Sequence, residues 1–473
     1  MIAAFHLPAL AHLPTATWGY GRGKSGIVLR LPQLTPALLR LQLDSLKEAH
    51  HRYLAERPVE EIIEVIDQVA ARLLDADDPL RRIAATALPL VTGYSAPMIE
   101  RVLDRMAADW RADRLRGLLE AEFGDPRVLD CFTTRSGAGG STRAFGPRLA
   151  LHVFSGNVPG VSITSLIRSL LVKAATLGKS AVGEPLLPAL FAQAVAEADA
   201  ELGACLAVAY WPGGDEALEG MALAAADAVV AYGGSDAVAS LRARTPAHSR
   251  FLGYGHRLSF GVVARECLTR REAEQVAAAA ALEAATFDQQ GCVSPHLFYV
   301  EEGGEVSARE WARLLAAALA RLERELPRGT LAPGEASAIR QLRGEAEFAQ
   351  IAGSGVELHA SVEGTTWTVI YDPDPAFAAS CLNRVVRVKP VAELEGIVPR
   401  IEPIASLLQT VGVAAHPQRL RALAEALGRL GASRVAVLGQ MAWPPPSWHH
   451  DGRPPLRDLV RWCDLEESVE RRA

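Results

Sequence analysis

Cys292 is the side chain with the clearest chemical potential in this sequence. It lies in the decapeptide FDQQGCVSPH (287–296), between an Ala-rich helical run (277–285) and an apolar strand-like run (297–300). Gly291 precedes it and a Ser-Pro pair follows it, and both glycine and proline disfavour continuation of a helix. A thiol in such a turn can meet a ligand and act as a nucleophile once it is ionised. Burial as an ordinary core cysteine fits these residues equally well.

A second candidate group follows an earlier apolar run, 148–154. There the segment SGNVPG (155–160) ends a strand pattern and opens a helix pattern. Asn157, at the carboxyl end of a strand, could donate a hydrogen bond to a carbonyl oxygen that is becoming an oxyanion. Gly156 allows close approach of a ligand, and the free N–H groups at a helix start favour anions. A plain strand-to-helix turn is the alternative interpretation.

Three further segments give weaker signals. Gly-Gly-Ser at 233–235 lies between a strand and a helix, with Ser235 as a natural N-cap, and could face a dinucleotide pyrophosphate. It lacks the Gly-x-Gly-x-x-Gly spacing, so an ordinary capped helix remains the alternative. Glu184 could reach a ribose hydroxyl, although a solvated loop carboxylate is more common. His449-His450-Asp451 resembles metal ligands only loosely, and we expect no metal site.

The elements that must position these groups are those of an α/β protein. Helical periodicity dominates 36–123 and predicts a helical N-terminal portion, 1–130, that packs on the cofactor domain. From residue 147 strands alternate with helices, which predicts a parallel sheet and an NAD(P)-binding domain, 131–265. Its expected strands are 148–154, 180–182, 206–211, 228–232, 250–252 and 258–264. Open sheets of this kind bind ligands beyond the carboxyl ends of their strands.

A second α/β unit surrounds Cys292, and we assign a catalytic domain to 266–440. It includes two strand-like runs, 356–362 and 366–371, joined by a probable turn. The tail, 441–473, is rich in Pro and Trp near its start, which suggests docking on the body of the protein or in an oligomer. A Gly/Ser segment at 136–141 predicts a hairpin tip or linker.

Composition limits the functional classes. The chain has 473 residues, of which 49% are hydrophobic and 22% charged, as expected for a globular protein of several domains. A net charge of −6 provides no basic face for nucleic acid. Six scattered cysteines indicate free thiols in a reducing compartment. No transmembrane run or signal-peptide pattern is present, so we expect a cytoplasmic protein.

Three motifs together resemble a known family. A strand ending in Asn-x-Pro, a later Tyr-Gly-Gly-Ser and a Gln-Gly-Cys turn occur in that order, as in the aldehyde dehydrogenase superfamily. Within it, DQQGCVSPH (288–296) and the tail segment at 438–452 most resemble the bioluminescence-type (LuxC-type) fatty acyl-CoA reductases. The resemblance runs from about residue 55 to the C-terminus. It implies an aldehyde-dehydrogenase-like α/β fold, with a Rossmann-type cofactor domain plus an α/β catalytic domain.

The resemblance also implies roles for individual residues. Cys292 matches the nucleophile, and Asn157 matches the side-chain donor to the thioester oxygen, with the Cys292 backbone N–H as its companion. The implied cofactor-binding residues are Gly156, Pro159, Glu184, Gly233, Gly234 and Ser235.

Two departures from the superfamily bear on the reaction. Hydrolytic members carry a Glu-Leu-Gly-Gly-Lys segment whose Glu activates water, whereas 251–257 reads FLGYGHR and has no carboxylate. Losing that base disfavours hydrolysis of an acyl-enzyme. The Glu-x-Phe-Gly-Pro segment is replaced by NRVV at 383–386.

We therefore expect reduction of a long-chain fatty acyl-CoA or acyl-protein thioester to a fatty aldehyde through an acyl-cysteine. The cofactor is expected to be NADPH, with NADH as the other option, and the thiol of Cys292 to be partly exposed with a depressed pKa. A homo-oligomer and an acyl-transferring partner protein are the expected partners. The alternatives are an aldehyde dehydrogenase that forms acid or acyl-CoA, and a non-catalytic binding subunit of the same fold.

Overall fold

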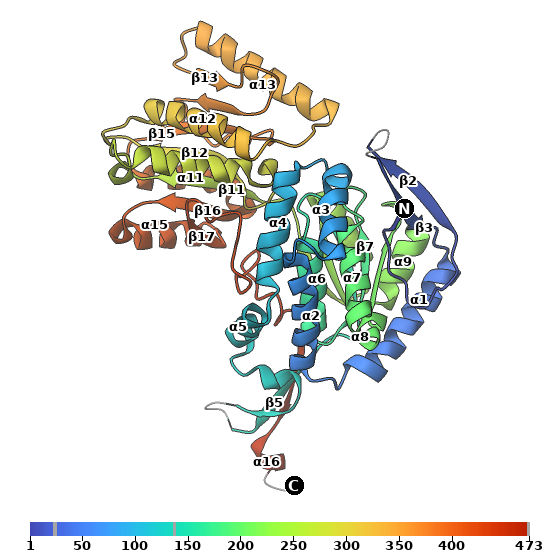
Figure 1. Cartoon of the computed structure of the whole chain (residues 1–473). Helices are drawn as coiled ribbons and strands as arrows, with labels where there is room; N and C mark the ends of the chain where they lie inside the picture. The colour runs from blue at the N-terminus through green and yellow to red at the C-terminus, as the bar shows by residue number, and fades with distance from the viewer. Residues whose placement is uncertain (22–25, 136–138, 471–473) are drawn as a thin grey trace.

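Two largely parallel sheets organise the chain (Figure 1). The computed structural model describes residues 1–21, 26–135 and 139–470. The first sheet has the strand order β10–β9–β6–β7–β8, and all of its pairs are parallel. Its strands are β6 (Leu149–Val153), β7 (Ala175–Ser180), β8 (Leu206–Tyr210), β9 (Ala228–Tyr232) and β10 (Arg250–Tyr254).

The order of these strands reverses direction once, which gives the sheet a switch point. From β6 the chain steps outward through β7 to β8, then returns to place β9 on the other side of β6. The connecting helices are α6 (Val161–Leu171), α7 (Leu187–Ala198), α8 (Ala200–Ala204), α9 (Glu216–Ala225) and α10 (Ser235–Arg244). The switch point of an open α/β sheet lies where the direction reverses, here between β6 and β9. The loops that follow these two strands are therefore the expected place for a ligand.

Two strand predictions for this sheet were wrong. The strand expected at 180–182 lies earlier, as β7, because its sequence ATLGKS is fully buried yet lacks an apolar run. The strand expected at 258–264 does not belong to this sheet. It forms β11 (Leu258–Val263), which pairs with β12 and β16 in the second sheet. The first sheet therefore ends at β10, and residues 255–257 carry the chain into the second.

The second sheet has the order β13–β14–β15–β12–β11–β16–β17 and is parallel except for the β13–β14 pair. The expected hairpin at 356–371 is this antiparallel pair. Helices α11 (Ala273–Ala285) and α12 (Ala308–Glu325) share a buried core with one face of the sheet. The remaining strands are β12 (Pro295–Glu301), β13 (Glu357–Ala360), β14 (Thr368–Tyr371), β15 (Val385–Val391), β16 (Leu408–Ala414) and β17 (Arg434–Val437).

The N-terminal portion contains the expected helices and also strands that the sequence did not predict. Those strands are β1 (Ile2–Ala3), β2 (Thr15–Tyr20) and β3 (Ile27–Pro32). The helices are α1 (Pro36–Ala49), α2 (Val59–Leu74), α3 (Pro79–Thr92), α4 (Ala96–Asp109) and α5 (Ala112–Phe123). Helix α2 packs on α6 and α7, so the N-terminal helices and the first sheet share one core.

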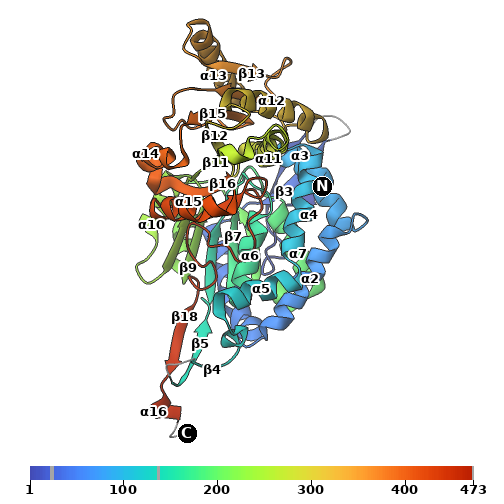
Figure 2. The same cartoon turned by 90° about the vertical axis from the view of Figure 1, so that its left-hand side faces the viewer.

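The C-terminal tail crosses the body and then extends away from it (Figure 2). The buried Glu283 carboxylate accepts hydrogen bonds from the backbone of Met441 and Ala442, and Glu122 accepts from Leu456. Docking on the body is thus observed for this stretch. Beyond it, β18 (Arg461–Leu465) pairs with β5 (Ser141–Phe145), which also pairs with β4 (Thr133–Thr134).

Three smaller expectations concern the whole chain. The Gly/Ser turn expected at 136–141 falls partly on 136–138, which lie outside the described residues. All six cysteines are free thiols, as expected. No helix within the described ranges has the length and apolar character needed to cross a membrane.

Candidate active site

The turn that carries Cys292 has an unusual backbone. Helix α11 ends at Ala285, a 3-10 turn covers Thr286–Gln289, and β12 begins at Pro295. Three consecutive residues other than glycine are left-handed, with φ of 54° at Phe287, 47° at Asp288 and 66° at Gln289. Such torsions cost energy outside glycine and persist only where the surroundings enforce them. Backbone strain thus lies just before Cys292.

Gly291 has a different role from the one expected. Its φ is not positive, so it does not supply the torsion that other residues avoid. A Cβ at this position would lie 3.2 Å from Ser294 Oγ and 3.3 Å from Phe287 Cδ2. Glycine therefore allows the turn to pack closely against itself.

A buried ion pair holds the strained turn. Asp288 Oδ1 accepts a hydrogen bond from Arg384 Nε at 2.8 Å and forms an ion pair with its Nη2 at 2.7 Å, and Arg384 is 1% exposed. Arg384 ends a second left-handed run, Leu382 to Arg384, and Asn383 N donates to Asp288 O at 3.1 Å. Gly329 N donates to the other carboxylate oxygen at 2.9 Å. The two left-handed runs thus fix each other, although 96 residues separate Asp288 from Arg384.

Asn157 is brought to the same turn. Its Nδ2 donates to the backbone oxygen of Gln290 at 2.8 Å, two residues before Cys292. The Tyr94 hydroxyl lies 2.5 Å from Asn157 O and 3.1 Å from Phe287 O, so it links the two loops. Tyr94 follows α3, in a region where the sequence indicated no chemistry. No local signal could have identified it, because both of its partners are distant in sequence.

Cys292 as a whole residue is half-buried, and the pKa of its thiol is shifted in the direction opposite to the expected one. Burial raises the pKa of Cys292 from its ordinary value of 9.0 to about 11, and the Asp451 carboxylate contributes to the rise. The Gln409 side chain hydrogen-bonds to the thiol and offsets part of the shift. The expected depressed pKa is therefore wrong. That expectation considered only the residues of the turn, whereas burial by the surrounding segments has the larger effect on the pKa of the thiol.

Asp451 reaches the site from the tail. Its side chain is 2% exposed and accepts hydrogen bonds from Arg257 Nε at 2.9 Å and Gln409 Nε2 at 2.7 Å. Arg257 belongs to the stretch 251–257, where the sequence lacks the hydrolytic carboxylate. The stretch thus supplies a cation, and the tail supplies the acid that pairs with it.

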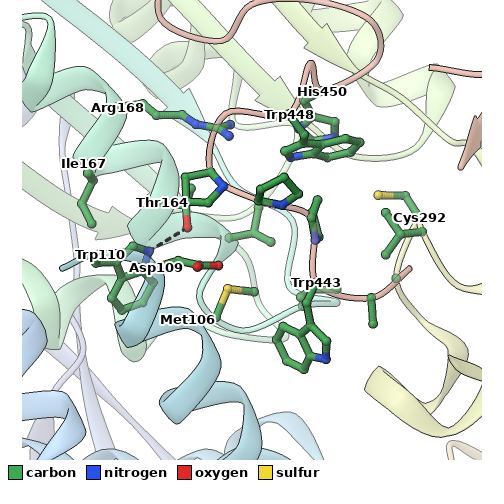
Figure 3. A pocket seen from close by; sticks show the side chains of 18 of the residues that line it. Met106, Asp109, Trp110, Thr164, Ile167, Arg168, Cys292, Trp443, Trp448 and His450 are labelled. Atoms are coloured by element: carbon green, nitrogen blue, oxygen red, sulfur yellow. Dashed lines mark hydrogen bonds between the residues drawn. The ribbon is translucent and has the colours of Figure 1, made fainter. Parts of the chain in front are cut away.

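An apolar pocket of about 130 Å³ opens beside Cys292 (Figure 3). Its wall combines residues of α4, α5 and α6 with the nucleophile turn and the tail, including Met106, Val158, Leu118, Trp443 and Trp448. In the tail, His450 stacks between Tyr254 at 4.3 Å and Trp448 at 4.7 Å. Burial lowers the pKa of His450 to about 4, which keeps the imidazole neutral near pH 7.

The expected cofactor residues lie around the switch point of the first sheet. A Cβ at Gly234 would meet no other atom within 4 Å, and one at Gly233 would meet only Ala237 Cβ at 3.8 Å. Protein packing therefore does not require these glycines, and the open space fits close approach of a phosphate group. By contrast, a Cβ at Gly156 would lie 3.1 Å from Glu184 N, so Gly156 allows two loops to pack together.

Two of these residues differ from expectation in detail. Ser235 is the first residue of α10, whereas Gly234 is the N-cap and no side chain caps this helix. Glu184 is 4% exposed, so it is not a solvated loop residue. Its Oε1 accepts hydrogen bonds from Leu186 N at 3.0 Å and Leu187 N at 2.7 Å, at the start of α7, and burial raises its pKa to about 7. Pro159 is buried just before α6.

Comparisons with known proteins agree with this arrangement. The long-chain acyl-protein thioester reductase of Aliivibrio fischeri is 24% identical over 416 residues, which cover 86% of this chain and 82% of that protein. The enzyme of the same name from Vibrio harveyi is 24% identical over 443 residues, which cover 90% and 88%. Aldehyde dehydrogenase 21 from Physcomitrella patens superposes with a TM-score of 0.75 at 14% identity and covers 98% of both chains.

The structural match confirms the expected aldehyde-dehydrogenase-like fold. The family model described as acyl-CoA reductase (LuxC) matches residues 54–462, which is most of the sequence. The chain therefore belongs to the acyl-CoA reductase (LuxC) family of thioester-reducing oxidoreductases.

Proposed function

We propose that this protein reduces a long-chain fatty acyl thioester, borne by CoA or by an acyl-protein, to a fatty aldehyde through an acyl-Cys292 intermediate. One observation carries the proposal: a cysteine on a strained, ion-paired turn forms part of the wall of an apolar pocket. A thiol so placed can take an acyl group from a thioester while the hydrocarbon chain lies against apolar side chains.

Acylation begins when the Cys292 thiolate attacks the thioester carbonyl and the carrier thiol leaves. An amide nitrogen carries two hydrogens, and Asn157 Nδ2 uses one of them on Gln290 O. The second is available for the developing oxyanion, together with the backbone N–H of Cys292. With a thiol pKa of about 11, Cys292 must lose its proton as substrate binds. Gln409, which favours the charged form, assists this step.

The reductive half needs a cofactor, for which we propose NADPH held beyond β6 and β9 by Gly156, Pro159, Gly233, Gly234 and Ser235. Glu184 lies beside them, with its carboxylate directed at the start of α7. When bound, NADPH supplies the hydride that reduces the acyl group. Asn157 also stabilises the oxyanion that develops when the acyl group is reduced. The carbon–sulfur bond to Cys292 then breaks, the aldehyde leaves, and the thiolate takes up one proton.

The surroundings of the thiol favour reduction over hydrolysis. The Asp451 carboxylate is the charged group that raises the pKa of the Cys292 thiol, and its two oxygens already accept hydrogen bonds from Arg257 and Gln409. A carboxylate engaged in this way is poorly suited to activating water, since a general base must be within reach of the proton it removes. An aldehyde dehydrogenase working toward acid would need such a base.

Labelling tests the proposal. The protein incubated with radiolabelled long-chain acyl-CoA should acquire label that hydroxylamine releases, and Cys292→Ala should abolish it. Cys205→Ala is the matched control, because Cys205 is a buried cysteine at the end of α8, next to the first sheet and away from the turn of Cys292. Label that persists in Cys292→Ala would contradict the assignment.

A second assay separates the alternatives. NADPH and NADH oxidation should be followed over a series of acyl-CoA lengths, with trapping of the aldehyde. Faster turnover of aldehyde with NAD(P)⁺ than of acyl-CoA with NADPH would favour the dehydrogenase. An unlabelled protein that oxidises no cofactor would favour the binding subunit.

A further inference from the structure

A closed wall faces Cys292 across the apolar pocket, and Trp110 is its largest side chain. Trp110 lies at the corner between helices α4 and α5 and lines the pocket. In Figure 3 Trp110 and Ile167 lie on one side of the pocket and Cys292 on the other. Trp110 is 2% exposed and Ile167 is 1% exposed. The tail residues Trp443 and Trp448, by contrast, are partly exposed. An acyl chain that extends from Cys292 across the pocket therefore meets a wall from which solvent is excluded.

The indole of Trp110 is fixed on two sides. Its Nε1 donates a hydrogen bond to Thr164 Oγ1 at 3.0 Å, which Figure 3 draws as a dashed line. Its ring also lies against the buried Phe191 of α7, with the ring centroids 6.3 Å apart and the planes at 59°. If the indole moved away from Thr164, its N–H would be left without a partner among apolar side chains, which is costly. Trp110 is therefore a rigid wall that an acyl chain does not easily push aside.

Hydrogen bonds also hold this wall at a fixed separation from the nucleophile turn. The Thr164 hydroxyl that accepts from the indole donates in turn to Gly160 O at 3.2 Å, at the start of α6. Gly160 belongs to the same loop as Asn157, whose Nδ2 donates to Gln290 O on the nucleophile turn at 2.8 Å. One short loop thus connects the wall to the turn. The space for an acyl chain between the thiol and the indole is therefore set by the scaffold of the protein.

We propose that Trp110 sets the longest acyl chain that the protein accepts, and that Thr164 positions the indole for this purpose. Each further methylene buried in the pocket improves binding until the end of the chain reaches the indole. A longer chain must displace a fixed side chain or bend toward the partly exposed tail, and overfilling a packed site costs more than a methylene gains. This inference rests on the proposed function and names the residue that limits its substrate class.

The wild-type protein provides the first test. Saturated acyl-CoA thioesters of increasing length, from hexanoyl to eicosanoyl, are compared by NADPH oxidation and by the mass of the acylated protein. Up to the limit, kcat/KM should rise about fourfold with each methylene. Beyond the limit, the next longer chain should lose about tenfold or more in kcat/KM. A value of kcat/KM that stays level or keeps rising up to eicosanoyl-CoA would overturn the inference.

Substitution of the indole then assigns the limit to Trp110. Trp110→Phe replaces the indole by a smaller ring, so the longest accepted chain should increase by about two carbons. Trp110→Leu, which is smaller again, should move the limit at least as far. The matched control is Trp311→Phe, because Trp311 is a buried tryptophan of α12 in the core of the second sheet, and this variant should keep the wild-type limit. An unchanged limit in Trp110→Phe would contradict the assignment, as would an equal shift in the control.

A pair of variants at Thr164 tests its positioning role. Thr164→Val keeps the shape of the side chain and removes the hydroxyl, so Trp110 stays in place but loses its hydrogen bond. The loss of kcat/KM beyond the limit should then become about three- to tenfold smaller, the effect of one hydrogen bond. Thr164→Ser keeps the hydroxyl and should restore the wild-type loss. If the two variants discriminate equally between chain lengths, Thr164 does not position the indole.

The outcomes separate this inference from the proposed function. If no thioester acylates Cys292, the proposed function itself fails. If chains of every length acylate Cys292 without a limit, only the role of Trp110 is wrong. If Trp110→Phe slows all chain lengths by the same factor, the residue is structural and the inference fails. If Trp110→Phe does not fold, the wild-type series and the two Thr164 variants still decide.

Discussion

The reactivity of the Cys292 thiol provides the most direct check on the reasoning about the site. With a pKa of about 11, about one thiol in 10⁴ is ionised at pH 7, against about one in 10² at the ordinary value of 9.0. Because only the thiolate reacts with iodoacetamide, alkylation of Cys292 at pH 7 should be about 100-fold slower than for an unperturbed thiol. The rate should rise about tenfold per pH unit up to about pH 10.

Asp451→Asn isolates the electrostatic part of this shift. After burial, the Asp451 carboxylate is the next cause of the raised pKa. Replacing it removes a negative charge and leaves Arg257 without its carboxylate, so both changes favour the thiolate. Alkylation of Cys292 at pH 7 should therefore speed up about tenfold, the effect of a neighbouring charge worth one pKa unit. Asp464→Asn, an exposed acid on β18, is the matched control.

The assay is alkylation with labelled iodoacetamide between pH 7 and 10, quantified on the peptide that contains Cys292. The slope of the logarithm of the alkylation rate against pH decides whether the pKa is raised, because restricted access to the thiol lowers all rates without changing this slope. A plateau already reached below pH 8 would refute the raised pKa. Slower alkylation in Asp451→Asn than in the control would refute the role of the charge.

Three other predictions concern the scaffold of the site. Arg384→Met leaves Asp288 buried and unpaired, so urea unfolding should show a loss of about 3–5 kcal/mol, and a loss below 1 kcal/mol would contradict the ion-pair argument. Asn157→Ala should slow acylation in stopped flow by about 10²–10³, with Tyr94→Phe as the milder positional control. Glu283 has a folded-state pKa of about 7 against 4.5, so its contribution to stability is present below pH 4.5 and lost as pH rises through 7. In Glu283→Gln the pH dependence of the unfolding free energy should become shallower by up to roughly 3 kcal/mol over that range, and an unchanged slope would contradict the shift.

Local sequence patterns predicted the parts of this fold that depend on local physics. Apolar runs between loop signals located β6, β8, β9 and β12, because fully buried parallel strands need apolar side chains on both faces. The sequence pattern did not predict the bounds of β7, because Gly178, Lys179 and Ser180 are buried without being apolar. The partners of β11 could not be read from its residues, since an apolar strand fits either sheet equally well.

The residues of the site also divide into those that a local sequence pattern reveals and those that it does not. Asn157 and the turn at Cys292 carry local signals, namely a polar residue at a strand end and helix-breaking neighbours. The residues that hold them, Tyr94 and Arg384, have no such signal because their contacts span 63 and 96 residues. The pKa of the thiol was predicted wrongly for the same reason, since it depends on burial by segments that are distant in the sequence.

The tail segment at 441–450 has a consequence for how the protein matures. It supplies one wall of the pocket, yet it follows every strand of the two large sheets in the chain. During synthesis the domains can therefore form, with Cys292 already on its turn, before the pocket exists. Until the tail docks on Glu283, the thiol faces solvent without the walls that select its substrate. Arrival of the tail thus acts as a late assembly step that completes the site.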